Sequence, residues 1–278
     1  MSVRLPTFIG IGAVKSGSTS IYHYLGEHPD VYVSPVKETN FFAFEGQKAS
    51  RYRVRTWAAY TAQFTPSDSQ RAVGEFSPIY MERPCAAHRI ADALPDVKLI
   101  ASLRSPVDRA YSDWINLVRH GTERESAEIA IRPGSRYFDR GCYSKLLQPY
   151  LELFARERIK ILMFEALAAD PARSMSELYK FLDVDPDFVP DVTTRHNAAR
   201  FPRYLRLNRM WQALRRAQPE WFRAPEAVIR WNRRLMENTY TAPSPMDPEL
   251  RATLLDLYRD EVGCMEELLG CDLEMWRR

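Results

Sequence analysis

Cysteine and histidine are scarce in this sequence, which limits the metal and redox chemistry that it can support. Among 278 residues there are four cysteines and five histidines. Neither type recurs at the spacing of a metal site, so we expect no metal requirement. The cysteines are typical of reduced thiols in a cytosolic protein. The histidines show no triad-like pattern, and we interpret them as structural or surface residues.

Long apolar runs are also missing. Charged residues interrupt every apolar stretch before it reaches the length of a membrane span. Residues 1–6 lack the apolar core and the cleavage site of a signal peptide. We therefore expect a cytoplasmic protein.

Lysine is absent from residues 195–234, where arginine is abundant. This segment holds eleven arginines and two acidic residues, a net charge of +9 in a chain whose total is +3. The rest of the chain then carries −6, and this asymmetry indicates an anionic partner for one face. A pair of solvated amphipathic helices explains the same composition equally well.

Five short apolar runs predict buried strands, and helical apolar spacing lies between them. The runs span residues 7–13, 31–34, 72–76, 97–103 and 158–164. Strands that alternate with helices indicate a parallel α/β sheet. We therefore expect a P-loop-like three-layer fold with a central parallel sheet of about five strands. Strand signals stop beyond Pro190, so we expect an α/β core over residues 1–190 and a helical C-terminal part of the same domain over residues 191–278.

A loop of small residues joins the first predicted strand to a helix. Its sequence from Gly12 to Gly17, GAVKSG, has the glycine spacing of a Walker A loop. An ATPase would need a lysine followed by serine or threonine, but Ser18 and Thr19 stand there and the lysine comes earlier, at Lys15. The backbone N–H groups and the helix N-terminus still favour a phosphate. The pattern indicates that Lys15 lies beside the group attached to that phosphate.

A second phosphate motif follows the fourth predicted strand. Arg104 ends that strand, where ligand sites of α/β proteins form, and Ser112 lies two turns into the next helix. An arginine fork and a hydroxyl are suitable phosphate ligands. We interpret Arg109, between them, as an intrahelical or packing residue.

These two motifs together resemble a known family. The run IGAVKSGSTSIYHYL is similar to the 5'-phosphosulfate loop of sulfotransferases that use 3'-phosphoadenosine 5'-phosphosulfate (PAPS), above all the bacterial and heparan-sulfate-type branch. An arginine followed eight residues later by a serine resembles the family's 3'-phosphate motif. Val14 and Ser18 replace the proline and threonine of many relatives, and both keep the chemistry of the loop. The similarity extends from about residue 7 to residue 185.

The resemblance implies a PAPS site with 3',5'-ADP as the product. In relatives a late arginine-containing loop closes over the nucleotide, and we assign Arg200 to it, although Arg195 and Arg203 are equally eligible by composition. The nucleotide-binding residues that we predict are Lys15, Ser16, Gly17, Ser18, Thr19, Ser20, Arg104, Ser112, Tyr143 and Arg200.

Two side chains are candidates for the chemistry. Lys15 is placed to stabilise negative charge on the leaving phosphate. The run from Lys37 to Phe42 resembles a Lys-Glu-x-x-Phe-Phe motif in which the glutamate is the catalytic base, which points to Glu38. Asn40 stands where many relatives have histidine, so an assisting imidazole is absent. Glu75 is the alternative base, and an ion pair with Lys37 is the alternative role for Glu38.

The acceptor cannot be identified from the sequence. Aromatic residues crowd the segment after Glu38, and we expect half of them in the core and the others in a wall for a sugar, aromatic or apolar acceptor. A small molecule, a glycan and a lipid-like metabolite all fit. We expect the basic segment, residues 195–234, to be a cover over the acceptor side; a dimer surface and a membrane-facing patch for a lipid-like acceptor are its alternatives.

Three other functions stay open at this stage. A P-loop nucleotide kinase would need the Gly-Lys-Ser/Thr step that the loop lacks. A non-catalytic nucleotide-binding protein would have little use for Lys15, Glu38, Arg104 and Ser112 together. Nucleic-acid binding by the basic segment lacks a recognition motif, so we expect no nucleic-acid partner.

We predict tight binding of 3',5'-ADP and much weaker binding of ADP or ATP, because the chain has two separate phosphate motifs. Isothermal titration calorimetry with the three nucleotides measures the difference. Equal affinities for 3',5'-ADP and ATP would contradict the assignment.

Overall fold

The computed structural model of the chain describes residues 4–44, 54–192, 201–204, 210 and 240–278. The chain forms two compact units, each assembled from separate stretches of sequence. The core unit comprises Met1–Ser105, Cys142–Asn197 and Asp260–Trp276. The helical unit comprises Pro106–Gly141, Ala198–Arg259 and Arg277–Arg278.

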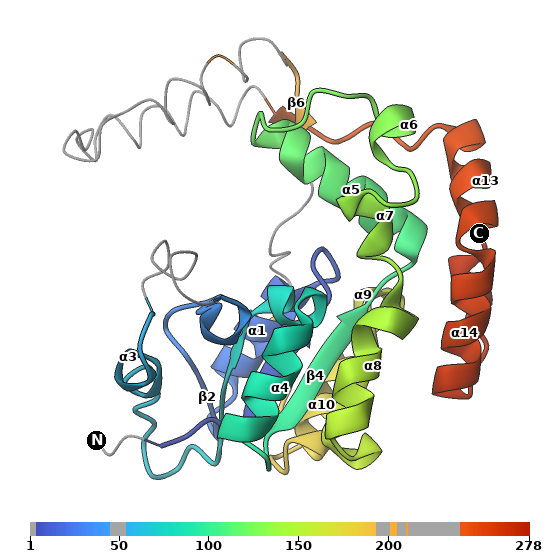
Figure 1. The fold of residues 1–278 in the computed structure, drawn as a ribbon. Helices are drawn as coiled ribbons and strands as arrows, with labels where there is room; N and C mark the ends of the chain where they lie inside the picture. The colour runs from blue at the N-terminus through green and yellow to red at the C-terminus, as the bar shows by residue number, and fades with distance from the viewer. Residues whose placement is uncertain (1–3, 45–53, 193–200, 205–209, 211–239) are drawn as a thin grey trace. The chain divides into compact units, whose positions relative to one another are not determined.

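The core unit contains a five-stranded parallel sheet in the order β2-β3-β1-β4-β5. Strands β2 and β4 of this sheet are labelled in Figure 1. The strands are β1 (Phe8–Gly12), β2 (Val31–Val33), β3 (Ala72–Phe76), β4 (Lys98–Leu103) and β5 (Ile159–Met163). All five strands expected from the sequence are confirmed. Because every strand runs the same way, all their carboxyl ends lie at one edge of the sheet.

Helices cover both faces of this sheet, which confirms the three-layer fold. Ile9 and Ile11 of β1 pack into one apolar cluster, and Phe8, the residue before Ile9, packs into another, as the alternation of a strand requires. The first cluster includes side chains of α4 (Pro84–Ala93), α8 (Tyr143–Leu153) and α14 (Arg259–Leu269). The second includes side chains of α1 (Ser18–Glu27) and α10 (Pro171–Phe181).

Short elements complete the core unit. Helix α3 spans Trp57–Thr61 and α9 spans Phe164–Ala169. Single 3-10 turns are η1 (Phe41–Ala43), η2 (Pro78–Glu82), η3 (Arg156–Arg158) and η4 (Glu274–Trp276). Both η1 and η2 follow strands at the carboxyl edge of the sheet, so they lie where a ligand site forms in this class of fold.

The helical unit is built around α5 (Pro106–Arg119), with α6 (Ala127–Ala130), α7 (Arg136–Asp139) and α13 (Pro248–Leu257). An antiparallel pair, β6 (Phe201–Pro202) and β7 (Tyr240–Thr241), belongs to it and was not expected. Strands of two residues are too short to show an alternating pattern in a sequence. The basic helices expected between Tyr204 and Arg234 lie almost entirely outside the described residues.

Two absences can be stated for the part of the chain that the structure describes. It has no helix long and apolar enough to cross a bilayer. It also has no group of three or more histidine, cysteine, aspartate or glutamate side chains that could hold a metal ion.

Two glycine substitutions test the packing of the core unit in opposite directions. A Cβ added at Gly74 in β3 would lie 2.3 Å from the Phe8 carbonyl oxygen, whereas one at Gly263 in α14 would meet nothing within 4 Å. We expect Gly74→Ala to destabilise the protein by about 1–3 kcal/mol. Gly263→Ala should stabilise it by up to about 1 kcal/mol, since alanine favours the helix. Chemical denaturation measures both, and equal effects would contradict this packing.

Candidate functional site

The loop after β1 turns the chain sharply before α1 begins. Lys15 and Gly17 both have left-handed backbone conformations, with φ of 70° and 84°. Gly17 is the N-cap of α1, where it provides no side-chain cap, and the first turn of the helix contains no acidic residue. The first N–H groups of a helix have no partner within it, and the helix dipole favours an anion there. The loop and helix therefore form a suitable site for a phosphate group.

The loop is held on the neighbouring strand β4. The Ala13 N–H donates to the Ser102 carbonyl at 2.7 Å, and the Ser102 hydroxyl donates to the Ser16 carbonyl at 2.5 Å. The Ser16 hydroxyl itself is fully buried and has no hydrogen-bond partner among the described residues. Most buried hydroxyls have a partner, so Ser16 leaves one polar group of the loop that no described protein group satisfies.

One aromatic ring links this loop to the second phosphate motif. A Cβ on Gly17 would lie 2.8 Å from the Phe164 ring, so the ring packs directly against the loop backbone. The guanidinium carbon of Arg104 lies 4.7 Å from the centroid of the same ring. The structure therefore brings the Gly17 loop and Arg104 to the same aromatic ring. That both contact phosphates of one nucleotide stays a prediction.

The backbone around Arg104 is fixed from two sides. The Tyr143 hydroxyl donates to the Arg104 carbonyl at 2.8 Å, and the Tyr143 side chain is fully buried. The Ser105 N–H donates to the Glu165 carboxylate at 2.8 Å, and the Trp276 indole N–H donates to its other oxygen at 3.3 Å. Tyr143 was predicted as a nucleotide contact. In the structure its hydroxyl holds the backbone carbonyl of Arg104.

Sequence reasoning missed two residues near this motif. The Ser105 hydroxyl is buried and, like that of Ser16, lacks a hydrogen-bond partner among the described residues. From the sequence, Phe164 is only the last residue of the fifth predicted strand, residues 158–164, and has no role in the site. Neither a serine beside an arginine nor a phenylalanine after a strand is a specific signal, so only the fold reveals their position.

The remaining predicted nucleotide residues are placed unequally. Ser18, Thr19 and Ser20 form the first turn of α1. Ser112 lies in α5 of the helical unit, so its approach to the nucleotide stays a prediction. Arg200 lies outside the described residues. Arg109 is confirmed as a packing residue: it is fully buried, donates to the Tyr137 carbonyl and lies 3.7 Å from the Asp113 carboxylate.

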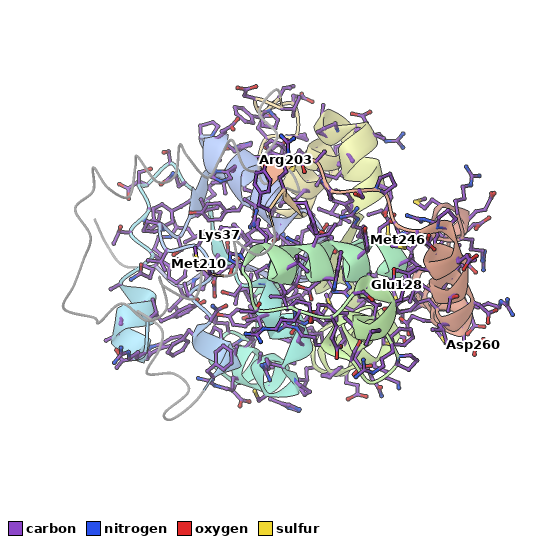
Figure 2. The ribbon with its side chains drawn as sticks, turned by 90° about the horizontal axis from the view of Figure 1, so that it is seen from above. Lys37, Glu128, Arg203, Met210, Met246 and Asp260 are labelled. Atoms are coloured by element: carbon purple, nitrogen blue, oxygen red, sulfur yellow. The ribbon has the colours of Figure 1, made fainter. Side chains whose placement is uncertain are left out.

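Glu38 lies at the same carboxyl edge of the sheet. Its N–H donates to the carbonyl of Phe76, the last residue of β3, at 3.0 Å. Its φ of 61° is left-handed, a conformation that costs a non-glycine residue about 1–2 kcal/mol. The side chain is half exposed and forms an ion pair of 2.7 Å with Lys37. Lys37 is labelled in Figure 2. The carboxylate is thus accessible to an acceptor, and the ion pair weighed as its alternative role is also present.

Glu75, the other base candidate, has a different environment. It is fully buried in β3, and four hydroxyl groups donate to its carboxylate, at distances from 2.7 to 3.3 Å. Burial raises the pKa of Glu75 above its ordinary value, and the four hydrogen bonds oppose that rise. The described residues provide no cation to pair with it. A carboxylate without exposed surface is poorly placed to receive a proton from an acceptor.

The aromatic segment after Glu38 divides between core and surface. Phe42, Tyr60 and Phe64 are buried, as expected for part of the group. Trp57 is 42% exposed and stacks on Tyr60 with ring centroids 5.6 Å apart. Phe41 also stacks on Tyr60, with ring centroids 4.7 Å apart. The partly exposed Phe41 and the exposed Trp57 therefore both stack on the buried Tyr60.

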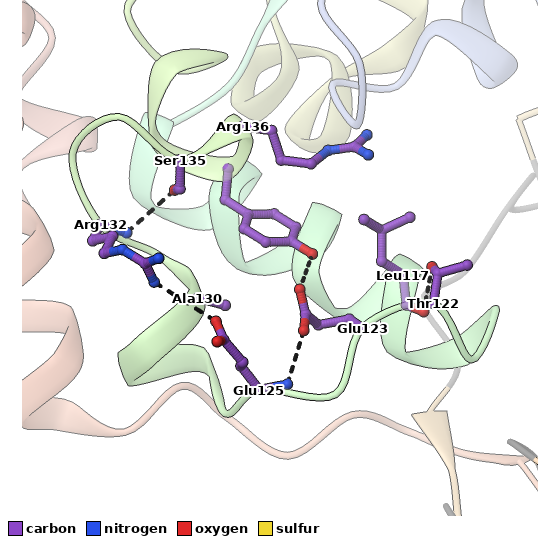
Figure 3. Close-up of a pocket in the computed structure, with 9 residues that line it drawn as sticks. Leu117, Thr122, Glu123, Glu125, Ala130, Arg132, Ser135 and Arg136 are labelled. Atoms are coloured by element: carbon purple, nitrogen blue, oxygen red, sulfur yellow. Dashed lines mark hydrogen bonds and ion pairs between the residues drawn. The ribbon is translucent and has the colours of Figure 1, made fainter.

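A cavity of about 470 Å³ lies in the helical unit (Figure 3). Its polar groups bind one another: the Tyr137 hydroxyl donates to Glu123 at 2.6 Å, and Arg132 lies 3.6 Å from Glu125. None of the site residues predicted from the sequence lines it.

The chain thus has a three-layer α/β fold with a loop after β1 that is suited to a phosphate group. Residues 6–210 match the family model described as "Sulfotransferase domain", and the chain belongs to this family. The resemblance to sulfotransferases noted in the sequence is thereby confirmed.

Individual relatives agree with this assignment. The chain is 29% identical over 204 residues to a bifunctional heparan sulfate N-deacetylase/N-sulfotransferase 1 of Caenorhabditis briggsae, a match that covers 66% of this chain and 23% of the relative. It is 36% identical over 112 residues to the membrane-associated sulfotransferase kil1 of Dictyostelium discoideum, covering 40% and 22%. The chain thus spans less than a quarter of the length of these relatives.

A solved structure is similar over the whole chain. The crystal structure of a sulfotransferase from Alicyclobacillus acidocaldarius aligns with a TM-score of 0.73 at 30% identity, covering 99% of this chain and all of that one.

Gly17→Ala should separate the role of the loop from general stability. The new Cβ would strain the left-handed backbone and displace the Phe164 ring, so we expect the affinity for 3',5'-ADP to fall by about tenfold or more. Gly270→Ala is the matched control, because Gly270 also has positive φ, at 64°, but its Cβ would meet nothing within 4 Å. Calorimetry should show that the control binds normally. Normal binding by Gly17→Ala would remove the loop from the nucleotide site.

Proposed function

We propose that this protein transfers a sulfuryl group from PAPS to a hydroxyl, or less favourably an amine, of a small-molecule, glycan or lipid-like acceptor. The observation that carries the proposal is the Phe164 ring, which contacts Gly17 and Arg104 at once. It brings a loop suited to a 5'-phosphosulfate beside an arginine suited to a 3'-phosphate. Among nucleotides, PAPS requires both contacts.

The described residues fit this nucleotide. The buried hydroxyls of Ser16 and Ser105 have no hydrogen-bond partner within the part of the chain that the structure describes, and each lies in one of the two phosphate motifs. The start of α1 has neither a side-chain cap nor an acidic residue to compete with an anion. When bound, PAPS supplies the sulfuryl group and a phosphate leaving group.

The reaction then needs two functions from the chain. The acceptor oxygen forms a bond to sulfur, the bond from sulfur to the phosphate oxygen breaks, and the acceptor proton moves to a base. Lys15 in the loop stabilises the negative charge that grows on the leaving oxygen. Glu38 receives the proton; a positioned base of this kind contributes about 10²–10⁴-fold. Its exposed carboxylate supports this role over the buried carboxylate of Glu75.

The spacing of the strands allows Glu38 and the Lys15 loop to act on the same acceptor and donor. Glu38 bonds to the end of β3, and Ser77 after β3 donates its N–H to Gly10 of β1 at 2.9 Å. The backbone of Glu38 thus lies two strand spacings, about 10 Å, from β1, the strand that precedes the phosphate loop. An acceptor between these two positions would reach both.

The acceptor class follows less directly. Relatives named as heparan sulfate N-sulfotransferases act on a glycan, and the partly exposed Trp57 offers a stacking surface for a sugar or aromatic ring. We therefore include glycans first in the acceptor panel that tests the proposal.

The test is a PAPS-dependent transfer assay over this panel, with the products detected by mass. Wild-type protein should release 3',5'-ADP and add one sulfuryl group to an acceptor. Lys15→Ala should lower kcat more than it weakens nucleotide binding, while Arg104→Ala should do the reverse, because only Lys15 contacts charge that develops in the transition state.

Glu38→Gln completes the set, since it keeps the shape of the side chain and removes the base. We expect it to lose most transfer and to bind 3',5'-ADP normally. Near wild-type turnover of Glu38→Gln would move the base to another residue. Transfer of phosphate from ATP in place of sulfuryl from PAPS would favour the kinase alternative.

A further inference from the structure

A fully buried carboxylate, Glu75, lies beneath the segment that carries Glu38. The hydroxyls of Thr39, Ser77 and Tyr80 donate to it at 2.9, 2.7 and 2.7 Å, and the Tyr60 hydroxyl completes the set at 3.3 Å. None of the described residues pairs a positive charge with it. The proposed chemistry makes no direct use of this group.

Three of the four hydroxyls also hold the backbone that follows Glu38. The Ser77 hydroxyl accepts the Asn40 N–H at 3.0 Å. The hydroxyl of Thr39 accepts the Phe41 N–H at 3.5 Å, and that of Tyr80 accepts the Phe42 N–H at 3.4 Å. Three consecutive N–H groups are therefore bound by hydroxyls whose protons are directed to one carboxylate.

The charge of the carboxylate explains this arrangement. An ionised carboxylate only accepts hydrogen bonds, so every hydroxyl that contacts it must donate its single proton there. The hydroxyl oxygens then turn their lone pairs toward the N–H groups of residues 40–42. A neutral amide at position 75 would present two N–H donors and could not orient all of these hydroxyls in the same direction.

The segment held in this way is one that needs support. Glu38 and Asn40 both have left-handed backbone conformations, with φ of 61° and 53°. Such conformations persist in non-glycine residues only when surrounding contacts impose them. The network around Glu75, together with the Glu38 N–H bond to Phe76, provides those contacts.

We propose that Glu75 is a positioning residue, which fixes the Glu38 carboxylate for proton transfer by orienting the hydroxyls of Thr39, Ser77 and Tyr80. The inference rests on the proposed function in so far as Glu38 is the base. Its structural part, the control of backbone residues 38–42 by Glu75, is independent of the reaction.

Three variants and two controls test the inference. Glu75→Gln removes the charge and keeps the shape. Thr39→Val removes a hydroxyl at constant volume, and Thr39→Ser restores the hydroxyl. Tyr80→Phe is matched by Tyr150→Phe, because the buried Tyr150 hydroxyl has no hydrogen-bond partner among the described residues.

Two measurements are made on each variant: amide hydrogen exchange of peptides covering residues 38–42, and kcat, KM and 3',5'-ADP affinity in the transfer assay. Glu75→Gln, Thr39→Val and Tyr80→Phe should exchange faster in this segment. Their kcat should fall, by about 10²-fold for Glu75→Gln, with nucleotide affinity unchanged. Thr39→Ser and Tyr150→Phe should resemble the wild type in both measurements.

The inference would be overturned if amide hydrogen exchange of residues 38–42 were unchanged in Glu75→Gln, Thr39→Val and Tyr80→Phe. Faster exchange in these variants with unchanged kcat would also overturn it. If Glu75→Gln fails to fold, Thr39→Val and Tyr80→Phe still decide the matter. If the wild-type protein transfers no sulfuryl group, the proposed function has failed, and the exchange data alone show whether Glu75 controls the segment.

Discussion

The packing of Phe164 against Gly17 is the contact on which the proposed nucleotide site depends. Phe164 follows β5 and Gly17 follows β1, and these strands are not neighbours, because β4 lies between them. The ring therefore reaches across the end of β4, where Arg104 lies over it. Only a glycine lets the ring come this close while adopting the left-handed turn that starts α1. One contact thus sets the distance between the two phosphate motifs.

The other half of the sheet edge is organised by a buried charge. Removing a carboxylate from water is costly unless hydrogen bonds replace its hydration, and four hydroxyls do so at Glu75. Those hydroxyls come from three separate parts of the chain: Thr39 after β2, Tyr60 in α3, and Ser77 and Tyr80 after β3. Hydrogen bonds to the Glu75 carboxylate therefore hold these three parts of the chain together beside Glu38. Strands β1, β4 and β5 support the proposed phosphate contacts, and β2 and β3 support the proposed base.

Much of this arrangement could be predicted from the sequence. The five strands are short, continuous apolar runs, which buried parallel strands require, and the loop from Gly12 to Gly17 shows its glycine spacing directly. The link through Phe164 could not be predicted, because Gly17, Arg104 and Phe164 are far apart in the chain and meet only when the order β1-β4-β5 is known. The role of Glu75 was hidden for the same reason: its four donors form no sequence pattern. The two-residue strands β6 and β7 carry too few residues for any periodicity.

The central claim is that one nucleotide bridges the two phosphate motifs around Phe164, with Glu38 facing the transferred group. A crystal structure with 3',5'-ADP bound tests it most directly. The account predicts the 5'-phosphate on the N–H groups between Lys15 and Ser20 and the 3'-phosphate on the Arg104 guanidinium, with Phe164 still packed on Gly17. A nucleotide bound elsewhere, or one whose 3'-phosphate points away from Arg104, would contradict it.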